Sequence, residues 1–205
     1  IASALKALEP DMAGGRAVVA HLGSGASLCA LEHGISRDTS MGFSTIDGVP
    51  MATRSGAIDP GVIFHLVEAH GLSVKDLEEM IYKQSGLLGL SGISADSRVL
   101  LETPSKEACE ALDIFTFRIA GEIARLTVTL GGIDTLVFTA GIGENQPTIR
   151  RSVVDRLRFL GLLLDSEAND RNEAVISREE SRVKIRVIAT DEEQVIADDC
   201  LSLVS

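Results

Sequence analysis

The sequence predicts an α/β fold in which helices pack on a mixed β-sheet. Three short apolar stretches joined by tight connections come first, and strand-like and helix-like segments then alternate along the chain. Of the 205 residues, 45% are hydrophobic and 3% are aromatic, which predicts a sizeable and mainly aliphatic core. This length suits one large domain or a closely joined pair of domains.

The first stretches are interpreted as a meander of three strands at 16–21, 26–31 and 35–41. A loop of small residues joins the first two strands, and a turn at His33 and Gly34 joins the next two. Residues 1–10 resemble the tail of a helix, and 42–58 is predicted to be irregular.

Two helices are predicted next, at 60–70 and 74–84, the first with Asp59 as its N-cap and Pro60 as its first residue. Residues 86–98 are rich in glycine and serine and predict a loop. The strongest helix prediction is 104–130, ended by two glycines. Its apolar residues recur at steps of three or four: Ala108, Leu112, Phe115, Ile119, Ile123, Leu126 and Leu130.

Residues 134–161 predict a strand, a glycine loop at 140–145, and a helix with one apolar face. The segment 183–190 alternates as a strand does, and a last helix is expected from about Asp191. The predicted order of elements therefore ends in strand and helix alternation, as expected for an α/β sheet.

The formal net charge of −11 argues against nucleic acid or an anionic membrane as a partner. The apolar runs are too short to span a membrane, and the first residues do not form a signal peptide. The three cysteines, Cys29, Cys109 and Cys200, have no metal-binding spacing, so reduced core thiols in a cytosolic protein are expected.

Two glycine-rich segments are candidates for phosphate binding: HLGSGAS at 21–27 and AGIGEN at 140–145. Phosphate groups favour places where several backbone N–H groups converge, above all at helix N-termini. Gly141 and Gly143 permit close approach of a ligand or a positive φ. Each segment alone is better explained as an ordinary turn, and neither matches a P-loop or a dinucleotide fingerprint.

Together with DTSMGFSTIDGVPMATRSGAIDPG, SGISADSR and ATDEEQVIADD, these segments resemble the acetate kinase family, in the same order, from about Arg16 to Asp199. The resemblance implies a ribonuclease-H-like domain of the acetate and sugar kinase, chaperone ATPase and actin superfamily. The family's chain is about twice as long, and the motifs of its first half do not appear here. The resemblance therefore implies that 1–205 is the carboxy-terminal, nucleotide-binding half, without the amino-terminal domain.

The resemblance also implies the residues of the site. Arg54 would reach the transferring phosphoryl group as the catalytic residue, and Glu192 would help to hold magnesium. Ser24 stands where the family usually has asparagine. Nucleotide-binding roles fall on three groups: His21, Leu22, Gly23, Ser24 and Gly25 near the phosphates; Asp96, Ser97 and Arg98 as a second contact; and Gly141, Ile142, Gly143, Glu144 and Asn145 against the adenosine.

The implied reaction is the reversible transfer of a phosphoryl group from ATP, with Mg²⁺, to acetate, which gives ADP and acetyl phosphate. The implied partners are ATP or ADP, acetate or propionate, and a second copy of the chain bound through this half, in the cytoplasm. Because a carboxylic acid is ionised at neutral pH, the reaction needs charge stabilisation more than a base, and the planar, permanently charged group of Arg54 suits that task.

Other interpretations of these residues stay open. Asp96 is equally explained as the cap of a turn and Arg98 as the partner of a nearby acid, and Glu192 lies in a predicted first helical turn, where acids are favoured anyway. The isolated chain is expected to be inactive, or to act as a non-catalytic nucleotide-binding or dimerisation module. A propionate kinase is the alternative enzyme, GTP or pyrophosphate are alternative donors, and a chaperone-type ATPase is disfavoured by MATRSGAIDPG.

Overall fold

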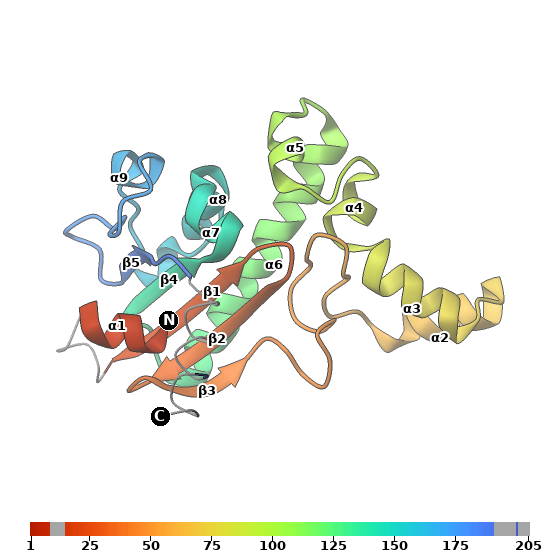
Figure 1. Cartoon of the computed structure of the whole chain (residues 1–205), viewed down its shortest axis with the longest axis horizontal. Helices are drawn as coiled ribbons and strands as arrows, with labels where there is room; N and C mark the ends of the chain where they lie inside the picture. The colour runs from red at the N-terminus through yellow and green to blue at the C-terminus, as the bar shows by residue number, and fades with distance from the viewer. Residues whose placement is uncertain (9–14, 191–199, 201–205) are drawn as a thin grey trace.

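The computed structural model describes residues 1–8, 15–190 and 200, and its centre is a five-stranded mixed sheet (Figure 1). The strands lie in the order β3 (Ile35–Thr39), β2 (Ala26–Glu32), β1 (Arg16–Leu22), β4 (Thr135–Thr139) and β5 (Lys184–Val187). The first three strands form an antiparallel meander, and β4 and β5 are added parallel to β1. The predicted mixed sheet is confirmed.

Strands far apart in the sequence meet in the middle of this sheet. Val19 of β1 lies opposite Val137 of the parallel strand β4. At the start of both strands, the guanidinium of Arg16 donates to the carboxylate of Asp134 over 2.8 Å, across 118 positions of the chain. The hydrogen bond from Arg16 is the main cause that lowers the pKa of Asp134.

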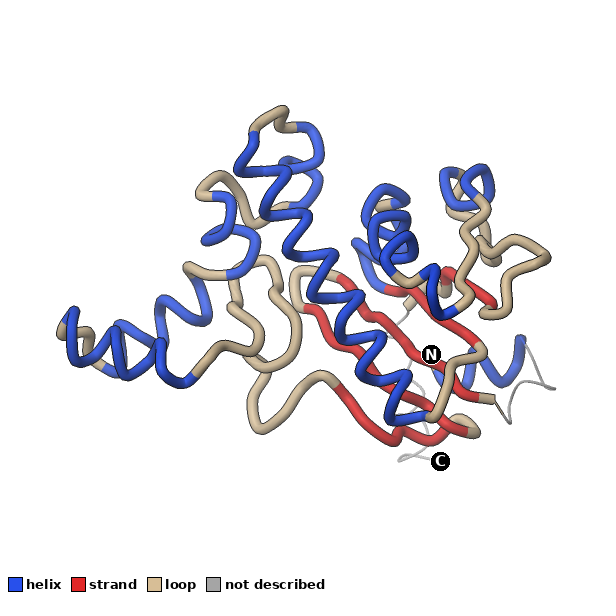
Figure 2. The backbone as a smooth tube through the Cα atoms, turned by 180° about the vertical axis from the view of Figure 1, so that it is seen from behind, coloured by secondary structure: helices blue, strands red, loops and turns tan. Residues whose placement is uncertain are grey.

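Helices cover both faces of the sheet. The long helix α6 (Lys106–Leu130) crosses one face, with α8 (Pro147–Arg156) beside it, as Figure 2 shows from behind. On the other face, α1 (Ala2–Leu8) packs its Leu5 against a cluster that includes Val19 and Val137. The sheet is therefore a central layer between helices.

The predicted helix at 104–130 is confirmed, with its start moved to Lys106. Ser105 is the cap, since its hydroxyl accepts a hydrogen bond from the backbone N–H of Ala108, and Pro104 precedes it. Gly131 ends the helix with φ +66°. Every predicted apolar position is buried except Leu112, which is half-buried, so the α6 face forms the centre of an aliphatic core.

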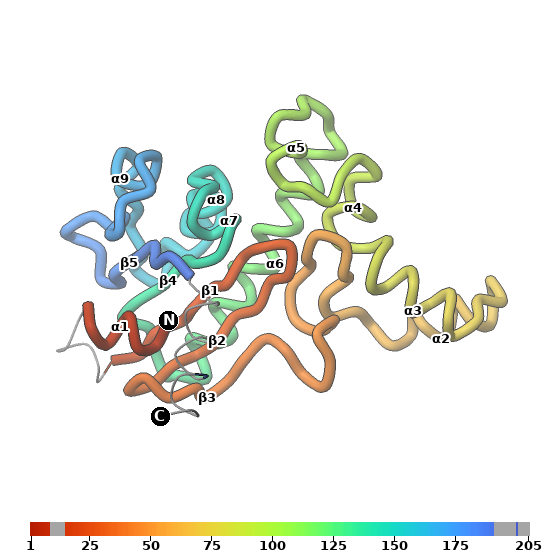
Figure 3. Tube along the Cα trace, viewed as in Figure 1, coloured from red at the N-terminus to blue at the C-terminus, as the bar shows by residue number. Residues whose placement is uncertain are grey.

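A helical hairpin of α2 (Pro60–His70) and α3 (Val74–Lys83) extends away from the sheet, in yellow in Figure 3. Asp59 is the N-cap of α2 as predicted, and its carboxylate accepts from the N–H of Gly61 over 2.8 Å. No residue of α2 is buried, although the helix is mostly apolar. Its apolar side chains are therefore left partly or largely in contact with solvent.

The loop predicted at 86–98 is wrong, because it contains α4 (Gly86–Ser91) and the start of α5 (Ser97–Glu102). Leu87 and Leu100 are buried in the core, and this packing outweighs the low helix propensity of glycine and serine. Gly86 has φ +57°, and a side chain there would collide with the carbonyl oxygen of Met51. A glycine is therefore required where α4 begins.

The glycine loop predicted at 140–145 is also wrong. Strand β4 passes directly into a short helix, α7 (Ala140–Asn145), and α8 follows. The sharp change of direction occurs at Ala140, which has φ +65°, and neither Gly141 nor Gly143 has a positive φ. The chain continues through a 3-10 turn (Arg158–Leu160) and α9 (Ser166–Asp170). The predicted last helix lies outside the described residues.

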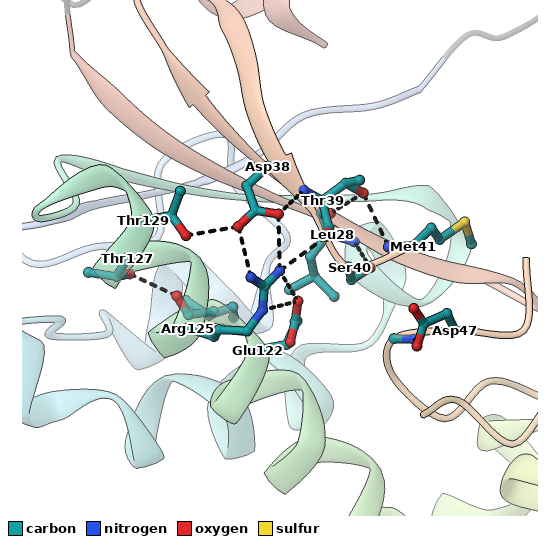
Figure 4. A network of polar contacts seen from close by, with 12 residues as sticks. Leu28, Asp38, Thr39, Ser40, Met41, Asp47, Glu122, Arg125, Thr127 and Thr129 are labelled. Carbon is teal, nitrogen blue, oxygen red and sulfur yellow. Dashed lines mark hydrogen bonds and ion pairs between the residues drawn. The ribbon is translucent and has the colours of Figure 1, made fainter. Parts of the chain in front are cut away.

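A polar cluster joins β3 to α6 (Figure 4). The carboxylate of Asp38 accepts from Arg125 and from Thr129, each over 2.8 Å, and Arg125 also donates to Glu122. The bond from Arg125, followed by that from Thr129, lowers the pKa of Asp38 to about 2. The edge strand is thus attached to the long helix through one ionised carboxylate.

The three cysteines are free thiols, as predicted, but they are not core residues. Cys29 is half-buried, whereas Cys109 and Cys200 are exposed, Cys109 on the outward side of α6. Within the part of the chain described, no helix has the length and apolar character needed to cross a bilayer.

Candidate functional site

Two adjoining pockets open beside the turn between β1 and β2 and the start of α7. The first, of about 640 Å³, lies between this turn, Met41, Ala140 and Thr190, and we call it the turn pocket. The second, of about 530 Å³, lies between the same turn, the start of α5 and α7, and we call it the α5–α7 pocket. Gly23, Ser24 and Gly141 line both, so the two pockets adjoin, and each has a size that suits small ligands.

The β1–β2 turn is shaped by main-chain bonds. The N–H of Gly23 donates to the carbonyl of Gly25 over 2.9 Å, and the carbonyl of Ser24 accepts from the N–H of Ala52 over 3.1 Å. A Cβ placed on Gly25 would lie 3.8 Å from Nη1 of Arg54. The turn therefore carries few side-chain atoms and has a guanidinium next to it.

Arg54 is half-buried in the long segment that precedes α2. Its Nη1 donates to the carbonyl of Thr45 over 3.3 Å, and no ion pair with a carboxylate is found for it among the described residues. The main chain around it is fixed from α4, where the N–H of Leu87 donates to the carbonyl of Met51. The positive charge of Arg54 is thus held in place and is available to an anion.

Helix α7 is held at its first residue by its own glutamate. Oε1 of Glu144 accepts from the N–H of Ala140 over 2.8 Å, and from both the N–H and the hydroxyl of Thr190 over 2.9 Å. Gly143 lets the helix lie close to β4, since a Cβ there would be 3.3 Å from the carbonyl carbon of Phe138. Glu144 therefore serves the structure of the pocket wall.

At the α5–α7 pocket, Asp96 and Arg98 have the ordinary roles that the sequence allowed. Asp96 is the N-cap of α5 and forms an ion pair of 2.7 Å with Arg98, whose hydrogen bond is the main cause that lowers the pKa of Asp96. The buried hydroxyl of Ser97 accepts from Nε2 of Gln146 over 2.8 Å. Asp96, Ser97 and Arg98 all line the pocket as well, so a ligand there would meet them.

The structure brings most of the predicted site residues together. His21, Gly23, Ser24, Gly25 and Gly141 line the turn pocket, and Ile142 and Asn145 line the α5–α7 pocket with Asp96, Ser97 and Arg98. Leu22 is fully buried in the core instead. Gly143 and Glu144 lie behind the wall, and Glu192 is outside the described residues.

Sequence reasoning did not predict Met41, Gln146 and Thr190 as wall residues, or Arg150 behind the wall, and it included Ala140 only as part of the candidate segment 140–145. Ala140 and Thr190 follow the carboxyl ends of two neighbouring parallel strands, β4 and β5, and residues at this edge commonly line ligand sites. That position in the sheet is the signal that could have found them.

The described residues do not form a cage for a metal ion. No group of three His, Cys, Asp or Glu side chains is placed to hold one in the ranges that the structure covers. The turn pocket is lined there by small residues, with His21, Met41 and Thr190. This wall fits an anionic group better than it fits a cation.

The chain is similar to several known proteins. Residues 2–198 match the model of the acetokinase family. The acetate kinase of Rickettsia felis is 45% identical over 189 residues, which are 92% of this chain and 49% of the relative. The acetate kinase of Methylocella silvestris is 46% identical over 200 residues, 98% of this chain and 50% of the relative.

Solved structures of the same kind confirm the predicted fold class. The acetate kinase of Porphyromonas gingivalis superposes with a TM-score of 0.92 at 38% identity, over 100% of this chain and 53% of that one. A propionate kinase from Francisella tularensis superposes with a TM-score of 0.90 at 39% identity, over 96% and 51%. The chain thus spans about half the length of these relatives, and these matches do not support its assignment to the carboxy-terminal half.

Proposed function

The chain belongs to the acetokinase family, and from this premise we propose that it carries the nucleotide site of an enzyme that phosphorylates acetate with ATP. The reaction gives acetyl phosphate and ADP and is reversible, and its place is the cytoplasm. The observation that supports this most is the meeting of three features at one site. They are the β1–β2 turn and the first residues of α7, which line the turn pocket, and the guanidinium of Arg54, which lines neither pocket but lies beside Gly25 of that turn.

The turn and α7 suit the nucleotide. The triphosphate would lie along the turn pocket, where Gly23 and Gly25 leave room for its oxygens to approach the main chain. The nucleoside would then lie in the α5–α7 pocket, against Gly141, Ile142 and Asn145. The two pockets adjoin at Gly23, Ser24 and Gly141, which supports the proposal that one extended ligand occupies both.

Arg54 suits the reacting group. Acetate is already ionised at neutral pH, so its attack on the terminal phosphorus needs no general base, and the main barrier is repulsion between two anions. A guanidinium can donate to two phosphoryl oxygens at once and keeps its charge at any working pH. Its lack of a carboxylate partner among the described residues leaves it free to stabilise the charge that develops in transfer.

Magnesium would accompany the nucleotide. When bound to the phosphates it would offset part of their negative charge, and such ions keep several waters and need few protein ligands. The described residues contain no cluster that would hold it by themselves, and Glu192 lies outside them. No step of the reaction is therefore assigned to the ion.

Acetate is the proposed substrate and propionate the alternative, since a structurally similar protein is a propionate kinase.

We propose further that turnover needs the rest of the family's length, because the chain spans about half of its relatives. Hydroxamate formation from ATP and either acid tests this, with the 205 residues and with a protein of the family's full length that contains them. Activity is expected in the longer protein alone, higher with acetate. Turnover by the 205 residues alone would refute the requirement, and an inactive longer protein would refute the kinase assignment.

A homodimer is also proposed, with α2 at its interface. No residue of α2 is buried, and Val62, Phe64 and Val67 are 46%, 63% and 42% exposed on the helix that extends from the body. Such an apolar surface is typical of an interface between subunits. Sedimentation should show a dimer for the wild type, a monomer for Phe64→Ser and a dimer for the control Phe159→Ser. A monomeric wild type would contradict the proposal.

A further inference from the structure

Arg150, in α8, is fully buried and yet uses every hydrogen-bond donor that it has. Its Nη1 donates to the carbonyls of Gly143 and Glu144, each over 2.9 Å. Its Nε and Nη2 donate to the side chain and the carbonyl of Asn169, over 2.8 and 2.7 Å, and Nη2 also donates to the side chain of Asn172 over 2.6 Å. Each of these acceptors is uncharged.

A buried cation without a carboxylate partner is costly to keep. Burial lowers the pKa of Arg150 to about 10, although the negative charge of Asp170 acts to raise it. The guanidinium therefore stays protonated at neutral pH. An apolar side chain of similar size would avoid the cost of desolvation. The guanidinium therefore provides something that an apolar residue cannot, namely five donors in one rigid plane.

The acceptors show what those donors hold. The carbonyls of Gly143 and Glu144 belong to the last turn of α7, where carbonyls lack partners within the helix. A cation at this end of a helix is also favoured by the helix dipole. The other acceptors, Asn169 and Asn172, belong to α9 and the turn after it. Arg150 thus joins α7 to α9 from behind the wall of the pockets.

We propose that Arg150 is a positioning residue of the nucleotide site, which holds α7 so that Gly141, Ile142 and Asn145 stay on the pocket walls. It touches neither pocket itself. The proposal rests on the proposed function for the identity of the ligand, whereas the fixing of α7 depends on the observed hydrogen bonds alone.

Two measurements on the 205-residue chain test this. The first is the Kd for ADP with magnesium, by calorimetry, and the second is amide hydrogen exchange in α7. The variants are Arg150→Lys and Arg150→Met. The matched control is Arg151→Met, because Arg151 also joins α8 to α9, through Asp170, without touching α7.

We expect Arg150→Met to weaken ADP binding by about tenfold or more, and Arg150→Lys by less, since small misplacements of a site have large effects. Exchange should rise in α7 more than in α8 for both variants. Arg151→Met should bind ADP within about twofold of the wild type and leave the exchange of α7 unchanged, since surface changes of this kind are nearly neutral.

Unchanged ADP binding and unchanged α7 exchange in a folded Arg150 variant would overturn the proposal. If the wild type binds no ADP but α7 exchange still rises in the variants, the positioning role stands and the proposed function fails. If neither Arg150 variant folds, amide exchange in α7 is measured on Asn172→Gly instead. It removes one acceptor of Arg150 at a residue with φ +53°, and unchanged α7 exchange in it would overturn the proposal.

Discussion

The two glycine-rich segments at the pockets are kept in shape by different parts of the chain. The β1–β2 turn is held by main-chain bonds, from Gly23 to Gly25 and from Ala52 to Ser24. Helix α7 is held by side chains, with the carboxylate of Glu144 at its start and the guanidinium of Arg150 at its end. Two segments of similar composition therefore form a turn held by its main chain in one place and a helix held by side chains in the other.

This difference separates two ways in which a mutation can act on the site. Around the turn, a change adds or removes atoms where a ligand would lie and leaves the fold alone. Around α7, a change acts on the ligand through the position of the helix. Measurements of stability and of function on the same variants can distinguish the two.

The largest effect is expected for Arg54→Ala, beside the turn. In a full-length enzyme, kcat should fall by about 10²–10³-fold, the usual result of losing a donor to the reacting group. The Tm should change little, because Arg54 makes one long hydrogen bond, of 3.3 Å, through its guanidinium to a protein oxygen. Steady-state kinetics and thermal melts measure both. A raised KM for ATP with an unchanged kcat would show that Arg54 binds substrate without assisting transfer.

An effect of intermediate size, on stability or on ADP binding, is expected from adding one methyl group to α7 or to the β1–β2 turn. Gly143→Ala should lower the free energy of unfolding by about 1 kcal/mol, since its Cβ would lie 3.3 Å from the carbonyl carbon of Phe138. Gly23→Ala should leave stability within about 0.5 kcal/mol, since its nearest neighbour would be at 3.4 Å, yet weaken ADP binding. Urea unfolding and calorimetry test the pair. The opposite pattern would remove the distinction between the two segments.

The smallest effect is expected for Asp38, whose hydrogen bonds to Arg125 and Thr129 attach the β1–β2–β3 meander to α6. The folded pKa of Asp38, about 2, lies below its unfolded value near 3.9, so its stabilisation is present above about pH 4 and is lost as the pH falls towards 2. Its contribution should be about 1 kcal/mol, because Arg125 is half exposed. Unfolding of the wild type and Asp38→Asn at pH 6 and pH 3 measures this. The stability difference should shrink at pH 3, and a constant difference would contradict the assignment.

The sequence predicted the strands, the Asp59 cap and the buried face of α6 because each depends on local spacing or a local cap. It did not predict α4, α5 and α7, since these short helices depend on distant partners: Leu87 and Leu100 in the core, and Thr190 and Arg150 around α7. The position of Arg54 beside Gly25 is also a property of the fold, although the resemblance to acetate kinases indicated both residues. Local sequence patterns thus predicted the strands and the long helix, whereas the short helices around the site depend on long-range contacts that these patterns do not show.

The parallel pairing of β1 with β4 has a consequence for how a new chain acquires its shape. The meander of β1, β2 and β3 can pair as soon as it leaves the ribosome, but the partner of its inner edge is made much later, as the 118 positions between Arg16 and Asp134 show. Until then that edge is an open template for other strands. We expect slow folding that is helped by chaperones, because a pairing at the centre of the sheet joins distant parts of the chain.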